Sequence, residues 1–214
     1  MKRSQRINLL LLLALVVLGI ALAATKSNCP AQGLALSREQ RAIHVLKNRT
    51  ALPRESDFDA NVSLSRMLLP GEDTTRWSSS SAARIQGYVV DITPGGIELA
   101  NCYSPWRRDT HIDVALRPDA PAREQVVVEI SATMREVAER QGQDWSEATL
   151  RRDLKGHWCS FEGWMFFDSG HARESENTAP GRSDNWRATA WELHPITHFE
   201  ITSRPSSVAE PLVY

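Results

Sequence analysis

Residues 144–167 read DWSEATLRRDLKGHWCSFEGWMFF and place a short helix directly before a strand. Asp144 is the expected helix N-cap because Glu147 follows three residues later, and Gly156 is suited to end the helix. The helix, from about 146 to 155, carries two leucines one turn apart and therefore has an apolar face. The stretch after the glycine alternates apolar and polar residues, which is typical of a half-buried strand.

Strand patterns also lie upstream of this helix. The stretches RIQGYVVDIT (84–93) and THIDVALR (110–117) alternate apolar and polar residues, and QVVVEISA (125–132) adds a short apolar strand or strand extension. The Pro-Gly-Gly sequence at 94–96 predicts a tight turn. We therefore expect GIELANCYS (96–104) to return along 84–93 as a β-hairpin.

Downstream of the helix, a polar loop at 168–185 precedes the last predicted strand, NWRATAWELHPITHFEI (185–201). The predicted order is three strands (84–93, 96–104 and 110–117, with 125–132 as a strand extension), then one helix, then two further strands. This is the order of an OB-fold, a five-stranded Greek-key barrel. In that fold the helix lies between strands three and four. The sequence therefore predicts a mainly β protein with an OB-like barrel over residues 84–202.

The region before the barrel, 37–83, is predicted to contain one helix and an extended lead-in that packs on the barrel. Ser37 and Gln40 form a capping-box pattern, so a helix should run from about 38 to 47. Scattered apolar residues among Pro and Asp then show no sustained period. Residues 203–214 are predicted to be a flexible tail.

The N-terminus has the pattern of a secretory signal. Residues 1–24 begin with three basic residues and continue as the apolar run INLLLLLALVVLGIALAA. Residues 7–24 are also long enough to span a bilayer, so a cleaved signal peptide and a retained inner-membrane anchor both stay open. Either alternative predicts an exported protein, periplasmic or extracellular, with a linker at 25–36.

The charge balance bears on the partners. The chain has 25 Lys and Arg against 26 Asp and Glu, a formal net charge of −1, and the signal segment removes three of the basic residues. Nucleic-acid binding proteins are usually basic, so the composition argues against nucleic acid. A protein, a glycan or a small molecule is the expected partner, and no cofactor is predicted.

Three cysteines leave the disulfide pattern open. An exported protein is compatible with disulfides, and a pair between Cys102 and Cys159 would leave Cys29 as a free or intermolecular thiol. The alternative is that Cys102 and Cys159 are separate buried residues beyond bonding range.

Several short sequences occur in the order of a known family. They are HVLKNR, GYVVDITPGGIELANC, DTHIDVAL, VVVEIS, GWMFFD, ENTAPG and NWRATAWELHPIT, between His44 and Ile201. In these the chain resembles a family of uncharacterised bacterial exported proteins that end in a Trp-Glu-Ile-His-Pro type strand. Leu193 stands where Ile is expected, and Ile130 with Ser131 where Val, Thr and Pro are commoner. The resemblance implies an OB-like barrel and no particular activity.

Histidines and carboxylates on the predicted strands are candidates for a metal or acid–base site. His111 and Asp113 lie two residues apart on one strand, and Glu192 and His194 do so on the last strand, so each pair shares a face. Mixed imidazole and carboxylate ligands suit Zn²⁺ or another first-row divalent ion. The candidates are His111, Asp113, Glu129, His171, Glu192 and His194. The alternative is a solvated strand face with no site.

A second candidate set lies near the predicted loop between the last two strands. Glu176, Asn177 and Arg187 are placed to hold a small ligand at the barrel mouth. The alternative is that Asn177 bonds only to the backbone of its own turn.

Taken as a whole, the sequence favours an exported, non-enzymatic binding or envelope-associated module. The first alternative is a metal-dependent hydrolase that uses the His and carboxylate residues of the barrel face. The second is a module that binds single-stranded nucleic acid or glycan on an OB-type face. We further predict that His194 is buried and hydrogen-bonded while His198 is exposed.

Overall fold

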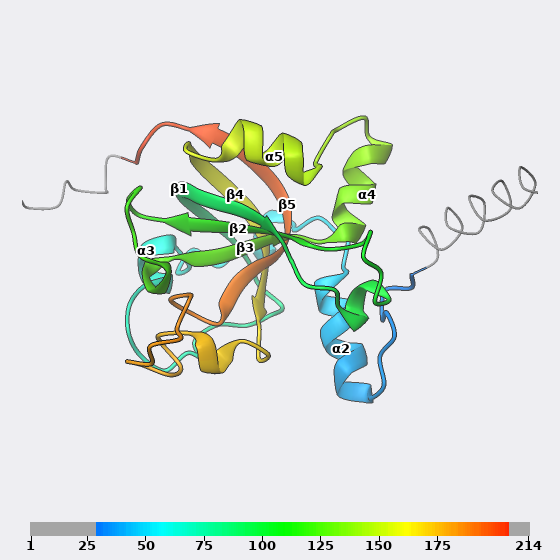
Figure 1. Cartoon of the computed structure of the whole chain (residues 1–214), viewed down its shortest axis with the longest axis horizontal. Coiled ribbons are helices and arrows are strands. Elements are labelled where there is room, and N and C mark those ends of the chain that lie inside the picture. Colours follow the sequence, from blue (N-terminus) through cyan, green and yellow to red (C-terminus); the bar gives the residue numbers. More distant parts are fainter. Residues whose placement is uncertain (1–28, 206–214) are drawn as a thin grey trace, which may run out of the picture.

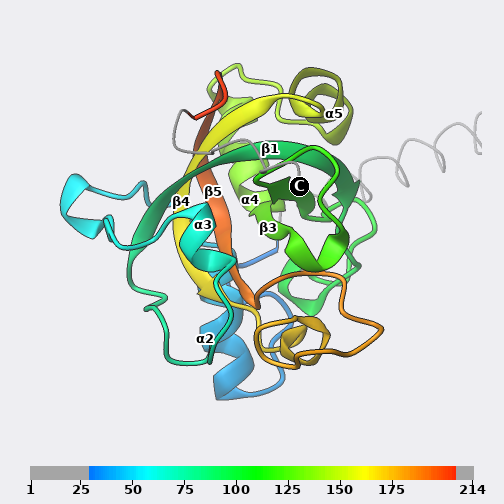
Figure 2. The same cartoon turned by 90° about the vertical axis from the view of Figure 1, so that its left-hand side faces the viewer.

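The computed structural model of the chain describes residues 29–205 and contains a closed five-stranded barrel (Figures 1 and 2). Its strands are β1 (Ala82–Pro94), β2 (Thr110–Ala115), β3 (Val126–Ile130), β4 (Trp158–Phe167) and β5 (Trp191–Thr202). They are ordered β1-β2-β3-β5-β4, and only the β3–β5 pair is parallel. This is the strand order of an OB-like barrel, so the predicted fold class is confirmed.

Helix α5 (Glu147–Leu154) connects the third and fourth strands as predicted. Its Leu150 and Leu154 join the barrel core. The N-cap is Ser146, whose hydroxyl accepts a hydrogen bond from the Thr149 amide. Asp144, the predicted cap, instead accepts hydrogen bonds from Ser146 and Thr149 just before the helix.

A helix that we did not predict, α4 (Ala132–Arg140), follows β3 directly. Ser131 caps it by accepting a hydrogen bond from the Met134 amide at 3.1 Å. The apolar run over 125–132 hid this boundary, because a short buried strand leading into a helix has no change of hydrophobicity at the junction.

The N-terminal region contains α2 (Arg38–Lys47), with Ser37 as its cap as predicted. The extended lead-in is interrupted by α3 (Leu64–Met67), whose Leu64 and Met67 enter the core. Short 3-10 turns occur at η1 (Glu55–Asp57), η2 (Leu99–Asn101), η3 (Ala122–Glu124) and η4 (Ala172–Glu174). The inner face of α2 carries the buried Lys47, which reaches toward the barrel wall.

The predicted hairpin over 84–104 is wrong. Residues 96–104 form a loop with the η2 turn, and β1 pairs with β2 instead, with Pro94 opposite Thr110. The physical reason lies at Cys102 and Tyr103, whose φ angles of 56° and 53° are left-handed and incompatible with a continuous strand. The last strand is also shorter than predicted, since it begins at Trp191.

The disulfide joins Cys29 to Cys102, with their Cα atoms 5.7 Å apart, so the proposed Cys102–Cys159 pair is wrong. Cys159 points into the barrel core as a buried thiol, and burial raises its pKa to about 11. Cys102 lies in the loop that follows β1, where its sulfur is already bonded to that of Cys29. The disulfide therefore attaches the described part of the predicted linker to the 95–109 loop. The Leu34 amide also donates a hydrogen bond to the Leu99 carbonyl in that loop at 2.8 Å.

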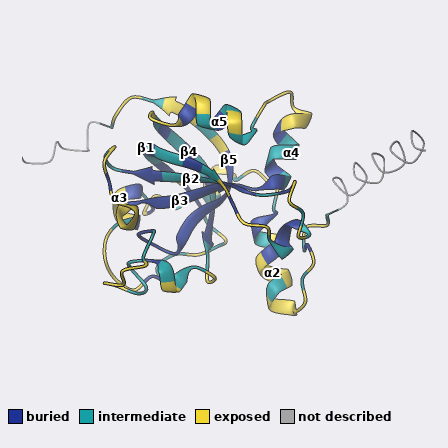
Figure 3. Cartoon of the chain, viewed as in Figure 1, coloured by how far each residue is buried: buried dark blue, intermediate teal, exposed yellow. Residues whose placement is uncertain are grey.

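Buried residues concentrate in the strands, while the outer faces of α2 and α5 are exposed (Figure 3). No helix within residues 29–205 is both long and apolar enough to cross a bilayer. The predicted signal or anchor at 1–24 and most of the predicted tail lie outside the described residues.

Candidate functional site

Five predicted site residues lie on the outer face of strands β2, β3 and β5. They are His111, Asp113, Glu129, Glu192 and His194. Their strand neighbours form the core inside the barrel, as alternation requires. A solvated face was the alternative to a site, but Glu129, Glu192 and His194 are each at most 2% exposed. This part of the outer face is covered by protein.

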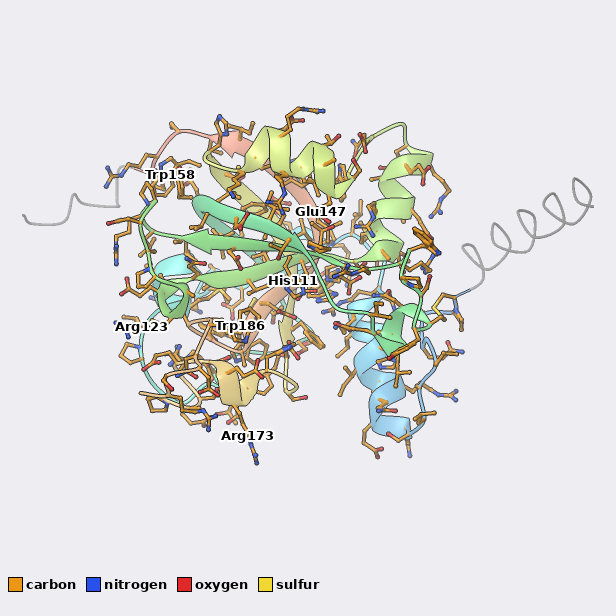
Figure 4. All side chains as sticks on the ribbon, viewed as in Figure 1. His111, Arg123, Glu147, Trp158, Arg173 and Trp186 are labelled. Carbon is orange, nitrogen blue, oxygen red and sulfur yellow. A yellow bond between two sulfur atoms is a disulfide. The ribbon has the colours of Figure 1, made fainter. Side chains whose placement is uncertain are left out.

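Three separate segments provide the cover. Lys47 of α2 pairs with Glu98 at 2.5 Å and lies near enough for its charge to interact with that of Glu129. Asp109 reaches the face from the end of the 95–109 loop, and Arg187 reaches it from the 168–190 loop. The 168–190 loop is attached to the edge of β3, where the Ala188 amide donates to the Gln125 carbonyl at 2.8 Å. Figure 4 shows His111 near the middle of the molecule.

The covered residues form what we call the polar cluster: Asp109, His111, Glu129, Arg187, Glu192 and His194. His111 lies opposite Glu129 in the β2–β3 register, with Nε2 3.0 Å from Oε1. His194 Nδ1 lies 3.2 Å from Glu129 Oε2 and donates a hydrogen bond to Glu192 Oε1 at 3.3 Å. The predicted buried, hydrogen-bonded His194 and exposed His198 are confirmed.

Arg187 connects the polar cluster to the protein surface. Its Nη2 donates to Glu192 Oε2 at 2.7 Å, and its Nη1 donates to Asp168 Oδ2 at 3.3 Å. The same Asp168 oxygen lies 2.5 Å from Nδ1 of His171, whose side chain is 39% exposed. His171 therefore lies at the margin of the network, and Arg187 is a buried ion-pair partner where we expected a ligand contact at the barrel mouth.

Asp109 is the member of the polar cluster that sequence reasoning missed. Its Oδ2 lies 3.6 Å from His194 Nε2, and the residue is 3% exposed. The signal was present in the sequence, because Asp109, His111 and Asp113 continue one period-two pattern. Asp109 precedes the predicted strand by one residue and was not among the predicted candidates.

The carboxyl groups of the polar cluster differ in their pKa values. Burial raises the pKa of Glu129, but the neighbouring charges of His111 and His194 outweigh burial and hold this pKa well below its usual range. Burial and the negative charge of Glu129 raise the pKa of Glu192, although Arg187 opposes the shift. Glu129 is thus the ionised carboxylate at the centre of the network.

The two central imidazoles favour their protonated forms. Burial lowers the pKa of His111, but the charge of Glu129 and its contact with that carboxylate outweigh burial and raise this pKa to about 9. Burial likewise disfavours charge on His194, yet Glu129 and the hydrogen bond to Glu192 raise its pKa above the ordinary value. Protonated imidazoles then offset part of the cluster's negative charge.

Acid–base and metal-binding groups thus converge here, but the arrangement is closed. A catalytic acid or base must come within hydrogen-bond distance of a substrate atom. The exposed fractions of Glu129, Glu192 and His194 leave no surface for such contact. Asp113 stays at the edge as a half-buried carboxyl that forms no ion pair with residues 29–205, and burial raises its pKa.

Glu176 and Asn177 do not join the polar cluster. Both carboxylate oxygens of Glu176 accept hydrogen bonds within the loop, from the Gly181 amide at 2.8 Å and from Asn185 Nδ2 at 2.7 Å. Asn177 donates to the Met67 carbonyl at 3.2 Å. Both side chains therefore stabilise the loop, and both also line a surface depression of about 330 Å³.

That depression continues into a larger one, which we call the arginine groove. It has a volume of about 760 Å³ and lies between α3, strand β1, the segment that joins β2 to β3, and the residues that follow β5. Its cationic lining residues are Arg84, Arg117, Arg123 and Arg204. The two depressions share Leu68, Arg123 and Glu124. In Figure 4 Arg123 and Trp158 lie at one side of the molecule, away from His111.

The four arginines of the groove differ in their partners. Arg84 pairs with Glu55 and Glu162, and Arg117 pairs with Asp119 and Glu124. The guanidinium groups of Arg123 and Arg204 form no ion pair with the residues that the structure describes, and both side chains are exposed. Arg204 lies over the Trp158 ring at 5.9 Å, and the charge of Arg123 acts on Glu176.

Comparison with known protein families finds no family model that matches the chain, and comparison with curated proteins finds no match. The geometry of the polar cluster and of the arginine groove therefore carries the functional argument.

Proposed function

We propose that this protein is an exported, non-enzymatic binding module that takes an acidic ligand in the arginine groove. The observation that carries the proposal is the pair Arg123 and Arg204, two exposed guanidinium groups without ion-pair partners among residues 29–205 that border one open groove. A guanidinium binds carboxylate and phosphate through paired, charge-assisted hydrogen bonds. The signal pattern at 1–24 supports export.

The groove has the size and composition of a ligand site. Its volume of about 760 Å³ falls within the range usual for small-molecule pockets. Apolar side chains, Leu64, Leu68 and Leu116, lie among the arginines and offer contact area for an apolar portion of the ligand. We therefore expect a ligand that combines an anionic group with an apolar part.

A catalytic role in the groove is not favoured. Among the described residues that line it there is no histidine or cysteine, and its one carboxylate, Glu124, is held by Arg117 at 2.6 Å. General acid–base catalysis requires a positioned group that can exchange a proton. The hydrolase alternative depends on the histidines and carboxylates of the polar cluster, where Glu129, Glu192 and His194 are buried and cannot contact a substrate.

The usual OB-type face is also not favoured as the binding surface. In OB-folds, oligonucleotides and oligosaccharides bind on the face of strands two and three and its adjoining loops. Here the 168–190 loop and Lys47 cover that side, and buried ion pairs fill the space beneath them. The arginine groove, in contrast, is open to a ligand without any movement of the 168–190 loop.

The test compares two groove variants with one control. Arg123→Ala and Arg204→Ala each remove a groove cation that has no ion pair among residues 29–205. Arg173→Ala removes an exposed arginine of the 168–190 loop that does not line the groove and that Figure 4 shows at the lower edge of the molecule. A fluorescent glutamate-rich peptide with one aromatic residue serves as the probe. We expect both groove variants to weaken the probe's Kd by roughly tenfold, about 1.4 kcal/mol, and salt to weaken it further.

The control decides between groove binding and general charge attraction. Arg173→Ala should leave the Kd of the wild-type protein unchanged. Equal loss in all three variants, or a wild-type protein that binds neither this peptide nor a phosphorylated version of it, would contradict the proposal.

A further inference from the structure

We propose that Asp109, Glu129 and His194 form a closed binding site for one first-row divalent cation. One ligand atom from each of the three residues lies within 4.8 Å of the others. The three residues come from the loop before β2, from β3 and from β5, and each is at most 3% exposed. A cation there would join three separate parts of the covered face. This inference is independent of the arginine groove.

Asp109 is held in place with one oxygen left over. Its Oδ1 accepts hydrogen bonds from Asn101 Nδ2 and from the Ala132 amide, both at 2.9 Å. Its Oδ2 faces His194 Nε2 at 3.6 Å, beyond hydrogen-bond distance. The carboxylate is thus oriented by the protein through one oxygen and presents the other to the centre of the three residues.

Glu129 and His194 each have one buried polar atom that forms no hydrogen bond within residues 29–205. Glu129 Oε1 lies 3.0 Å from His111, and His194 Nδ1 donates to Glu192. Glu129 Oε2 and His194 Nε2 are fully buried and form no hydrogen bond with the described residues, and the nearest ion contact of Oε2 is His194 Nδ1 at 3.2 Å. Buried polar atoms are almost always satisfied, so these two atoms indicate a missing ligand.

The position of the hydrogen on the His194 ring determines whether Nε2 can accept a cation. Nδ1 lies between the carboxylates of Glu129 and Glu192 and therefore carries a hydrogen, so in a neutral ring Nε2 would be an acceptor that faces the Asp109 carboxylate. Two acceptors facing each other in a buried space repel. Either a proton on Nε2 or a cation bound to it removes this conflict, and the two occupants are experimentally distinguishable.

The donor set and the surrounding contacts favour a metal ion. Two carboxylates and one imidazole suit Zn²⁺ and related first-row ions, and two negative charges balance a divalent cation. A metal-bound histidine usually donates its other N–H to a carboxylate, which is the role that Glu192 has toward His194. His111 Nε2 lies 3.0 Å from the remaining Glu129 oxygen, Oε1.

The experiment measures zinc binding by the purified full chain, prepared without a polyhistidine tag and dialysed against a chelator. Calorimetric titration with Zn²⁺ should show one equivalent bound by the wild-type protein. Asp109→Asn and His194→Gln should abolish this binding, and Glu192→Gln should weaken it by roughly 10- to 100-fold. His198→Gln, an exposed histidine on the same strand, should bind zinc as the wild-type protein does.

A second measurement keeps the test valid if a variant does not fold. X-ray absorption of the zinc-loaded wild-type protein should show only nitrogen and oxygen ligands at about 2.0–2.2 Å, including one imidazole. A folded wild-type protein that takes up no zinc would overturn the proposal and leave a proton on Nε2. Retained binding in Asp109→Asn and His194→Gln, or a sulfur ligand in the absorption data, would overturn it as well.

Discussion

Replacement of Asp168 by Asn should lower the free energy of unfolding by about 2 kcal/mol at neutral pH. Burial raises the pKa of Asp168, but the hydrogen bond with His171 and the charges of Arg187 and His171 outweigh burial and hold this pKa at about 2. The ordinary value is 3.8. Each pKa unit corresponds to about 1.4 kcal/mol, so the difference gives about 2 kcal/mol.

The sign of this contribution predicts how it depends on pH. The pKa of Asp168 is lower in the folded protein, so its stabilisation is complete above pH 4 or so and is lost as the pH falls toward about 2. The pKa of His171 is raised, chiefly by the hydrogen bond with Asp168, so its share is complete below its ordinary value of 6.5 and is lost as the pH rises through the raised value. The difference between wild type and Asp168→Asn should therefore be largest at about pH 4.5–6.

Urea unfolding of both proteins from pH 3 to pH 8 measures this difference. Asp184→Asn is the matched control, because Asp184 lies in the same loop and pairs with Arg182 while both side chains are more than half exposed. An exposed pair of this kind contributes at most about 1 kcal/mol. The reasoning fails if Asp168→Asn costs no more than Asp184→Asn, or if its cost stays constant between pH 5 and pH 3.

Two further predictions concern the disulfide and His194. Cys102→Ser should lower the free energy of unfolding by about 2–4 kcal/mol, because it removes a disulfide to Cys29 that spans 73 residues. Thiol labelling of the unreduced, denatured wild-type protein should modify Cys159 alone. Labelling at Cys102 would contradict the disulfide assignment. His194→Ala should lower the free energy of unfolding by about 3 kcal/mol, because it leaves buried carboxylates without their partner. His198→Ala should change it by less than about 0.5 kcal/mol in calorimetric melting. Equal changes in the two variants would contradict the argument from burial.

Local patterns in the sequence were sufficient to predict the barrel. Capping residues located α2 and α5, and alternation located β1, β2 and β4, because these signals lie within a few neighbouring residues. The failed hairpin marks the limit of such signals. A glycine turn followed by apolar residues looks the same whether the chain returns as a strand or enters a loop, and the disulfide to Cys29 is a distant contact that the pattern does not contain.

The polar cluster could be predicted only in part. Alternation placed His111 with Asp113 on one face of their strand, and Glu192 with His194 on one face of theirs, but the same pattern fits a face open to water. What buries them comes from positions far away in the chain: Lys47 in α2 and Arg187 in the last long loop. Convergence of this kind depends on tertiary packing, which local spacing does not encode.

The closed cluster also explains why binding is expected elsewhere on the barrel. Each buried charge costs several kcal/mol to desolvate, and the ion pairs offset this cost only while all partners stay together. Moving the 168–190 loop away would separate Arg187 from Glu192, a pair 2.7 Å apart with both side chains at most 1% exposed. Admitting a ligand beneath that loop therefore requires breaking a buried ion pair, whereas Arg123 and Arg204 border a groove that is already open and already cationic. For an acidic ligand the second route has the lower free-energy cost.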